Sequence, residues 1–76
     1  MELQLTLHGI LRDYLPRTAK GRTTLDLPSG TTVGDVVRQL KIKQNVSAAV
    51  DGVEVDDKHV LSSGEALHLF RFIAGG

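Results

Sequence analysis

Cysteine is absent from this sequence of 76 residues. Disulfides and thiolate metal sites are therefore excluded, which fits a reducing compartment. An excess of one charge is lacking too, because nine acidic residues balance nine basic ones, so no overall field favours nucleic acid or an anionic membrane. No apolar run approaches the ~20 residues that span a bilayer, and the opening MELQLTLHGI alternates too strictly for a signal peptide. We therefore expect a soluble, cytoplasmic protein with no membrane and no nucleic-acid partner.

Catalytic and metal-binding patterns are also lacking. The histidines, His8, His59 and His68, have no metal-ligand spacing and are expected to be surface or half-buried residues. Asp56 and Asp57 have no oxygen-rich loop around them of the kind that holds a divalent metal. The glycines are scattered at turns and form no phosphate-binding loop. The chain is therefore expected to bind no metal or cofactor and to have no active site of its own.

Charge is distributed unevenly along the chain. Residues 12–22 are basic, with only Asp13 to offset them, whereas residues 51–57 are acidic. The basic segment could contact phosphate, but it lacks the interleaved aromatic residues on which nucleic-acid bases stack. The asymmetry favours an oriented encounter with a partner.

Periodicity in the sequence predicts the secondary structure. Apolar residues alternate in MELQLTL, TTLDLP and ALHLFRF, which predicts half-buried strands at residues 1–7, 23–28 and 66–72. Between the first two, Ile10, Leu11, Tyr14 and Leu15 have the spacing of a short helical turn before a polar loop.

The clearest helix is predicted in TTVGDVVRQL, residues 31–40. Thr32 suits the N-cap, Asp35 completes a capping box, and valines at helical spacing form one apolar stripe. The clearest hairpin follows in VSAAVDGVEV, because Asp51-Gly52 supplies the positive φ angles of a type I′ turn between two apolar strands.

The order strand, strand, helix, strand, strand, strand indicates an α+β fold, with a mixed sheet of about five strands and one main helix packed on one face. Residues 1–76 are expected to form a single domain that ends in a flexible tail at residues 73–76. The loop after the hairpin is expected to bury Leu61. The predicted core consists of Leu3, Leu5, Leu7, Leu25, Leu27, Val36, Val37, Leu40, Leu67 and Leu69.

The last strand carries two aromatic residues on the face opposite Leu67 and Leu69. If Phe70 and Phe72 point to solvent, they mark a partner-binding site, because large exposed apolar groups are unusual on a small domain. Alternatively, the segment at residues 10–22 folds over them and forms a second small core. The sequence leaves both readings open.

The final residues, Ile73-Ala74-Gly75-Gly76, reach ~13 Å when extended. Glycines lack Cβ atoms and can therefore thread a narrow channel in another protein. The reactive group that they would deliver is the α-carboxylate of Gly76. A carboxylate is a poor electrophile, so an ATP-consuming partner would have to convert it to an acyl-adenylate before a nucleophile could attack.

These features together resemble a known family. The strand order, PSGTTVGDVV before the helix, VDGVEV, SSGEALHLF and the terminal IAGG are similar to the ubiquitin-like β-grasp sulfur carriers, across essentially the whole chain. That family includes the small subunit of molybdopterin synthase and the thiazole-synthesis carrier. LHGILRDYLP resembles a helical insert of the former, whereas LFRFIAGG lacks its proline pair and is closer to the tail of the latter.

The resemblance implies a role for the tail. A ubiquitin-activating-like adenylyltransferase would use MgATP to adenylate Gly76, and sulfur would then replace the adenylate to give a thiocarboxylate. This group would donate sulfur in cofactor biosynthesis, with molybdopterin the first expectation and the thiazole of thiamine the second. A synthase subunit would accept the sulfur. The partner-docking residues would be His68, Phe70, Arg71 and Phe72, with Ile73, Ala74 and Gly75 threaded into the partner's active site.

Two alternatives belong to other functional classes. The chain could be a protein modifier joined through Gly76 to lysines of its targets, which requires the same activation. It could also be a plain interaction domain in which the terminal glycines are incidental.

Overall fold

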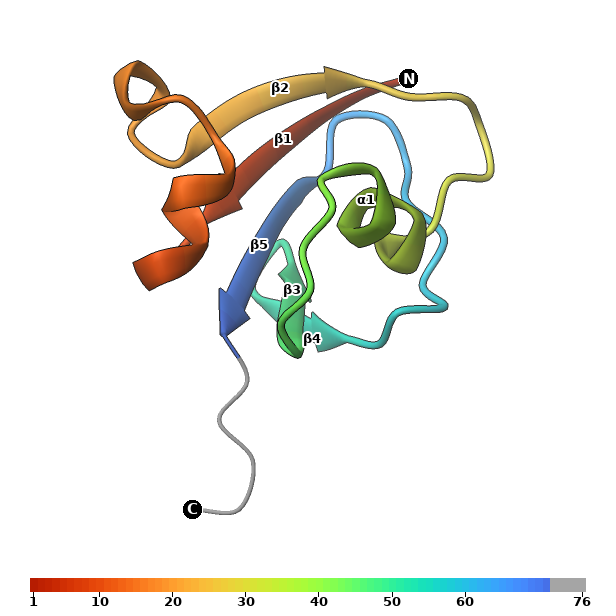
Figure 1. The fold of residues 1–76 in the computed structure, drawn as a ribbon. Helices are drawn as coiled ribbons and strands as arrows, with labels where there is room; N and C mark the ends of the chain where they lie inside the picture. Colours follow the sequence, from red (N-terminus) through yellow and green to blue (C-terminus); the bar gives the residue numbers. More distant parts are fainter. Residues whose placement is uncertain (72–76) are drawn as a thin grey trace.

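The computed structural model describes residues 1–71 (Figure 1). The expectations that concern Phe72 and the tail at residues 73–76 fall outside these described residues. The elements follow in the order β1 (Glu2–Leu7), η1 (Gly9–Tyr14), η2 (Arg17–Ala19), β2 (Arg22–Asp26), α1 (Val33–Gln39), β3 (Val46–Val50), β4 (Val53–Val55) and β5 (Ala66–Arg71).

The five strands form one mixed sheet in the order β2-β1-β5-β3-β4. β1 and β5 are parallel neighbours at the centre, with Leu5 opposite Leu67 and Leu7 opposite Leu69, and the other pairs are antiparallel. α1 lies across one face of this sheet (Figure 1). The predicted fold, a five-stranded mixed sheet with one main helix, is confirmed.

The core lies between α1 and the sheet. Leu3, Leu5, Leu7, Leu67 and Leu69 are fully buried, as expected for central strands whose alternate residues face the helix. Leu27, Val36 and Leu61 are buried as predicted. The core also contains residues absent from the predicted set, namely Leu11, Val33, Ile42, Ala48 and Val50.

Three predicted core residues are only partly buried. Leu25 is one of these because β2 is an edge strand with a neighbour on one side only. Val37 and Leu40 pack against the core from α1 and its end but remain partly exposed. The helical periodicity identified the apolar stripe correctly, but only its N-terminal half, Val33 and Val36, is buried.

The local signals for the helix and the hairpin are confirmed. The Thr32 hydroxyl accepts a hydrogen bond from the N–H of Asp35 at 3.2 Å, and the Asp35 carboxylate accepts one from the N–H of Thr32 at 3.0 Å. Asp51 and Gly52 have φ angles of 50° and 85°, as a type I′ turn requires. Within residues 1–71, no helix is long and apolar enough to cross a bilayer.

Candidate functional site

The face of the sheet turned away from α1 carries the candidate site; we call it the open face. Because side chains alternate along a strand, the residues between the buried leucines of β1 and β5 share this face. Thr6 of β1 pairs with His68 of β5, and on the other side Ser47 of β3 pairs with Phe70. The backbone N–H of His8 donates to the carbonyl of Leu69 at 3.1 Å, which places His8 next to Phe70.

Three rings gather at this end of the open face, and we call them the His8–His68–Phe70 stack. Nε2 of His8 lies 2.9 Å from Nδ1 of His68, within hydrogen-bond distance. The His8 ring lies nearly parallel to that of Phe70, with centroids 4.4 Å apart and an interplanar angle of 9°. Its centroid is 5.1 Å from that of His68. The ring of His8, which directly follows β1, therefore joins two rings of β5 into a single surface.

The environment of His8 favours its neutral form. Its pKa lies below the ordinary value of about 6.5 because partial burial disfavours the charged ring, with smaller contributions from His68 and Arg22. A neutral imidazole has one nitrogen that donates and one that accepts. His8 can therefore share one proton with His68 while its face packs on Phe70.

The structure brings together two of the residues predicted to dock a partner, His68 and Phe70. Phe70 keeps 40% of its surface exposed. Arg71 is exposed at the end of β5, and Phe72 lies beyond the described residues. The sequence did not single out His8 as a docking residue. The alternation of β1, if it continues past Leu7, places His8 on the same face as Thr6. This indicates a position beside Phe70 only once β1 and β5 are known to be neighbours.

The alternative in which residues 10–22 cover the aromatic residues is wrong for Phe70. Leu11 is fully buried in the main core, and Tyr14 and Leu15 pack against that same core. The segment therefore covers one end of the core and leaves Phe70 exposed. Leu11, Tyr14 and Leu15 of this segment pack on the other side of the sheet, whereas Ile10 stays exposed.

Within residues 1–71, no group of three or more His, Asp or Glu side chains is arranged to hold a metal ion. His8 and His68 form a pair, whereas His59 lies elsewhere with Nε2 3.8 Å from a carboxylate oxygen of Glu65. All three histidines are half-buried, as the sequence predicted.

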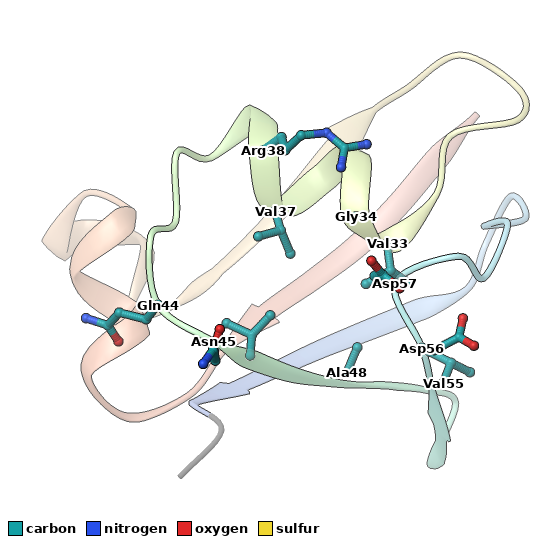
Figure 2. Close-up of a pocket in the computed structure, with 11 residues that line it drawn as sticks. Val33, Gly34, Val37, Arg38, Gln44, Asn45, Ala48, Val55, Asp56 and Asp57 are labelled. Carbon is teal, nitrogen blue, oxygen red and sulfur yellow. The ribbon is translucent and has the colours of Figure 1, made fainter. Parts of the chain in front are cut away.

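A groove of about 420 Å³ lies on the opposite side of the sheet, between α1 and the β3–β4 hairpin (Figure 2). Val33, Val37 and Val55 supply apolar walls, and Asp56 and Asp57 lie at one side. The carbonyl of Asp57 accepts the N–H of Gly34 at 2.8 Å, which ties this loop to the helix. The groove is thus separate from the His8–His68–Phe70 stack.

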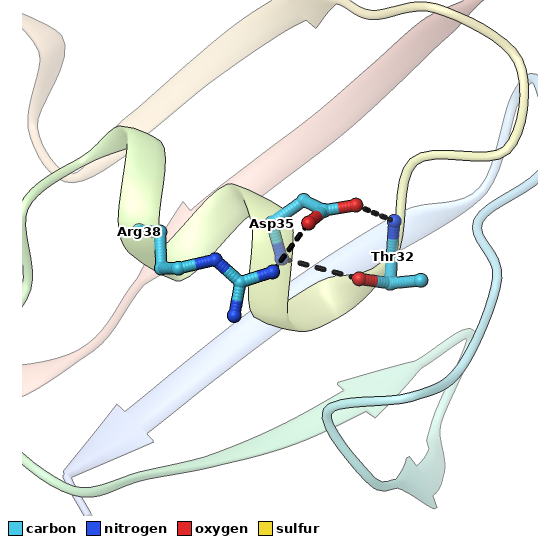
Figure 3. A network of polar contacts seen from close by, with 3 residues as sticks. All are labelled: Thr32, Asp35 and Arg38. Carbon is cyan, nitrogen blue, oxygen red and sulfur yellow. Dashed lines mark hydrogen bonds and ion pairs between the residues drawn. The ribbon is translucent and has the colours of Figure 1, made fainter.

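Arg38 borders this groove, but its charge is already engaged (Figure 3). Its guanidinium donates to the Asp35 carboxylate, which also accepts the N–H of Thr32. The pKa of Asp35 is lowered, first by the Thr32 N–H and then by Arg38. The described lining of the groove offers no activated nucleophile or acid–base pair, so the open face remains the better candidate.

Comparison with known proteins agrees with this fold. The model of the ThiS family matches residues 11–76, and no curated protein sequence is significantly similar to the chain. The solution structure of the Haloferax volcanii HVO 2177 protein is similar, with 25% identity and a TM-score of 0.78, covering 100% of this chain and 87% of that one.

Two other solved structures share the fold at lower identity. Small archaeal modifier protein 1 of Haloferax volcanii is 15% identical, with a TM-score of 0.74 over 95% of this chain and 98% of that one. A chain from the complex of subunits 1 and 2 of the molybdopterin-converting factor of Helicobacter pylori is 13% identical, with a TM-score of 0.62 over 100% of both chains.

Proposed function

This chain belongs to the ThiS family, and on that premise we propose that it is a sulfur carrier whose Gly76 carboxylate is adenylated and converted to a thiocarboxylate. The thiocarboxylate donates sulfur in cofactor biosynthesis, with molybdopterin as the first candidate pathway and the thiazole of thiamine as the second. The observation that carries the proposal is that the family match extends through the Gly-Gly pair to Gly76.

The proposed chemistry takes place in two steps on partner proteins. A carboxylate oxygen of Gly76 attacks the α-phosphorus of ATP, which forms the acyl-adenylate and releases pyrophosphate. Sulfide then attacks the acyl carbon and AMP leaves, so that one oxygen of the carboxylate has been replaced by sulfur. MgATP is in this scheme a substrate of the activating enzyme, an adenylyltransferase, and the carrier supplies only the reacting terminus and the surface that presents it.

The open face supplies a surface for docking. Phe70 and its stacked neighbours His8 and His68 lie at the end of β5, immediately before the segment that leads to Gly76. Exposed aromatic groups of this kind are typical anchors of protein interfaces. From Phe72 to Gly76 an extended chain spans ~17 Å, so a partner held at Phe70 could receive Gly76 in a deep active site.

A synthase subunit is the proposed acceptor. The Helicobacter pylori neighbour was solved as a complex of subunits 1 and 2 of the molybdopterin-converting factor, and this supports a heteromeric partner for the present chain. Arg71 follows Phe70 at the end of β5 and is exposed, but strand alternation puts it on the face opposite Phe70. A partner would therefore have to reach around the end of β5 to contact it.

Activation is tested with the untagged protein, its activating enzyme, MgATP and a sulfide source. We expect ATP–pyrophosphate exchange and an intact mass that is heavier by one oxygen-to-sulfur exchange, localised to a peptide ending at Gly76. Deletion of Gly76, or addition of one serine after it, should abolish both signals without changing the circular dichroism spectrum. Undiminished exchange by the truncated protein would contradict the proposal.

Docking is tested separately with two matched apolar truncations. Phe70→Ala should raise the KM for the activating enzyme or the Kd for the synthase subunit at least tenfold, since interface hot spots contribute about 2 kcal/mol or more. Val53→Ala, at a residue that is 66% exposed on β4, should change neither. Equal effects of the two variants would argue against docking at Phe70.

A protein modifier is the second candidate function, and the similarity to small archaeal modifier protein 1 favours it. It would share the adenylation step but end in an amide bond between Gly76 and a lysine amino group. Branched tryptic peptides from cell extracts distinguish the two functions. A modifier stays attached to a target lysine and gives such peptides, whereas a carrier ends in a thiocarboxylate and gives none.

A further inference from the structure

We propose that a cavity at the junction of β1, η1 and β2 is a binding site for the phosphate group of a small phosphorylated molecule. We call this cavity the basic pocket. It has a volume of about 290 Å³ and is lined by Thr6, Leu7, His8, Gly9, Arg12, Lys20 and Arg22. The inference goes beyond the sulfur-carrier function, because binding here requires no activation of Gly76.

The charge of the basic pocket is unbalanced. Arg12, Lys20 and Arg22 contribute three cations, and no carboxylate lines the pocket. Among residues 1–71, the ion pairs join the Met1 amino group to Asp26, Arg38 to Asp35 and His59 to Glu65, so none of the three cations is paired. The chain as a whole is neutral, so this excess of positive charge is a local feature.

The nearest acid in the sequence does not remove this imbalance. Asp13 lines a neighbouring cavity, which it shares with Arg12, Arg17 and Lys20. One carboxylate beside that cluster leaves a net positive region from η1 to the start of β2. A dianion is therefore the complementary ligand.

Backbone geometry positions Arg12 beside the pocket. A Cβ atom on Gly21 would lie 2.8 Å from Cγ of Arg12 and 3.1 Å from its Nε, so the arginine occupies space that only glycine leaves free. Gly21 has a φ of 78° and its carbonyl accepts the N–H of Leu7 at 2.6 Å. The stem of Arg12 thus lies against Gly21, while Arg12 as a whole remains exposed to an incoming ligand. Contact of the stem with the backbone restricts the side chain and reduces the entropy that binding would cost.

The chemistry of these groups favours phosphate. Arginine binds phosphate oxygens through two parallel N–H groups, and lysine adds a compact charge. Thr6 offers a hydroxyl from the same wall. The volume is at the lower end of small-molecule pockets, which leaves room for a phosphate and a small organic group. No Phe, Tyr or Trp side chain lines the pocket, and the ring of His8 is already stacked on Phe70. This disfavours a single-stranded nucleic acid, which needs free rings for stacking.

His8 connects the pocket to the His8–His68–Phe70 stack and reports on its occupancy. The ionisable groups around it are His68 from β5, Arg22 from β2, and Arg12 and Lys20 from the connection between β1 and β2. An anion among the cations would weaken the repulsion that a protonated His8 feels. Phosphate binding must therefore raise the pKa of His8, and protonation of His8 must strengthen phosphate binding to the same extent.

The experiment is an NMR titration of the full chain with inorganic phosphate at constant ionic strength, with chloride as the compensating anion. We expect saturable amide shifts confined to residues 6–12 and 20–22, together with an upward shift of the His8 pKa. Arg22→Gln and Lys20→Gln should each weaken binding at least fivefold, whereas Arg38→Gln should not. Shifts that do not saturate, or that are equal in Arg22→Gln and the unmodified protein, would overturn the proposal.

The same NMR titration distinguishes a small phosphate ester from an acidic protein segment as the ligand of the basic pocket. Glycerol phosphate should bind at least as tightly as inorganic phosphate and cause the same shifts. A glutamate-rich peptide is the competing ligand; if it binds these residues more tightly than the phosphate compounds do, the pocket recognises an acidic protein segment and the assignment to a small phosphate ester is wrong. Gly76 deletion should leave all these titrations unchanged, so that failure here and failure of the carrier function are distinguishable.

Discussion

The hydrogen bond between His8 and His68 requires one ring nitrogen to donate a proton and the other to accept it. If both rings are protonated, both facing nitrogens carry hydrogen and the bond is lost. The pKa of His8 is lowered, and its ring stacks on Phe70. The hydrogen bond that protonation breaks is therefore part of the proposed docking surface. The open face therefore depends on pH through His8, which directly follows β1.

Stability should decrease as this ring is forced to protonate. The folded pKa of His8 lies below the unfolded value of about 6.5, so the unfolded chain binds more protons in this range. The stabilising contribution is present above the unfolded pKa and is lost as pH falls through it towards the folded pKa. Urea unfolding between pH 7.5 and 5 should show this decrease.

A pair of variants separates His8 from other titrating groups. His8→Phe should remove part of the pH dependence of the unfolding free energy, whereas His59→Gln should leave the His8 contribution in place. If the pH profiles of His8→Phe and the unmodified protein are parallel, the ring does not carry the effect.

Glycine is required at position 21 for two reasons. Its φ of 78° strains any residue with a side chain, and a Cβ there would lie 2.7 Å from the carbonyl oxygen of Leu7. Gly21→Ala should therefore lower the free energy of unfolding by about 3 kcal/mol. Gly9→Ala is the matched control, because Gly9 has a φ of 59° with no atom within 4 Å, and its strain alone should cost about 1 kcal/mol.

Chemical denaturation of the two variants checks this comparison. If Gly21→Ala and Gly9→Ala lower the free energy of unfolding equally, backbone strain dominates and the atoms around Gly21 can make room for a Cβ. A larger loss in Gly21→Ala would also show that Arg12 and the end of β1 cannot move apart cheaply, as the geometry of the basic pocket requires.

At the scale of elements, α1 depends on its first turn. It has only seven residues, and valines favour helices weakly, so the capping box and the packing of Val33 and Val36 must hold it. Thr32→Ala removes the hydroxyl that accepts the Asp35 N–H. This change should cost about 1 kcal/mol.

Thermal unfolding is the appropriate measurement, because 1 kcal/mol corresponds to about 4–8 °C in Tm for a domain of this size. Thr32→Ser keeps the hydroxyl and should retain most of the stability. A Tm for Thr32→Ala equal to that of Thr32→Ser would mean that the cap contributes nothing beyond packing.

At the scale of the whole molecule, stability depends on the central pair of strands. A domain of 76 residues has a free energy of unfolding of roughly 4–11 kcal/mol. Leu67 is fully buried between β1 and β3, and Leu67→Ala should cost about 2–5 kcal/mol. This variant should be substantially unfolded at moderate temperature, while Val53→Ala on the edge strand should change stability by less than about 0.5 kcal/mol.

Hydrogen exchange tests, without mutation, whether the central strands are more stable than the edge strands. The slowest amides should be those of β1, β5 and β3, which have neighbours on both sides, and β2 and β4 should exchange faster because they are edge strands. Protection concentrated in β4 instead would contradict this view of the fold.

One end of the sheet brings the functional features together. His8 belongs both to the His8–His68–Phe70 stack and to the basic pocket, and β5 ends beside it. The proposed docking surface, the candidate phosphate site and the end of β5 thus lie at one end of the sheet. Docking and phosphate binding are expected to influence one another through His8.

The elements of this fold were predictable from the sequence because their determinants are local. Alternation in β1 and β5, the capping box at Thr32 and the turn at Asp51-Gly52 each involve residues that are near neighbours in the chain. The exposure of Phe70 was not predictable in this way, because alternation left open whether residues 10–22 cover it.

Only the tertiary structure decided which distant residues meet. His8 and His68 are 60 residues apart and become neighbours because β1 and β5 pair in parallel with one particular register. The basic pocket likewise requires that the connection at residues 9–21 bring Arg12 back to Gly21 beside the end of β1. Periodicity tells which face of a strand is buried, but strand order and register follow from how all the apolar faces pack at once, and no short stretch of sequence contains that information.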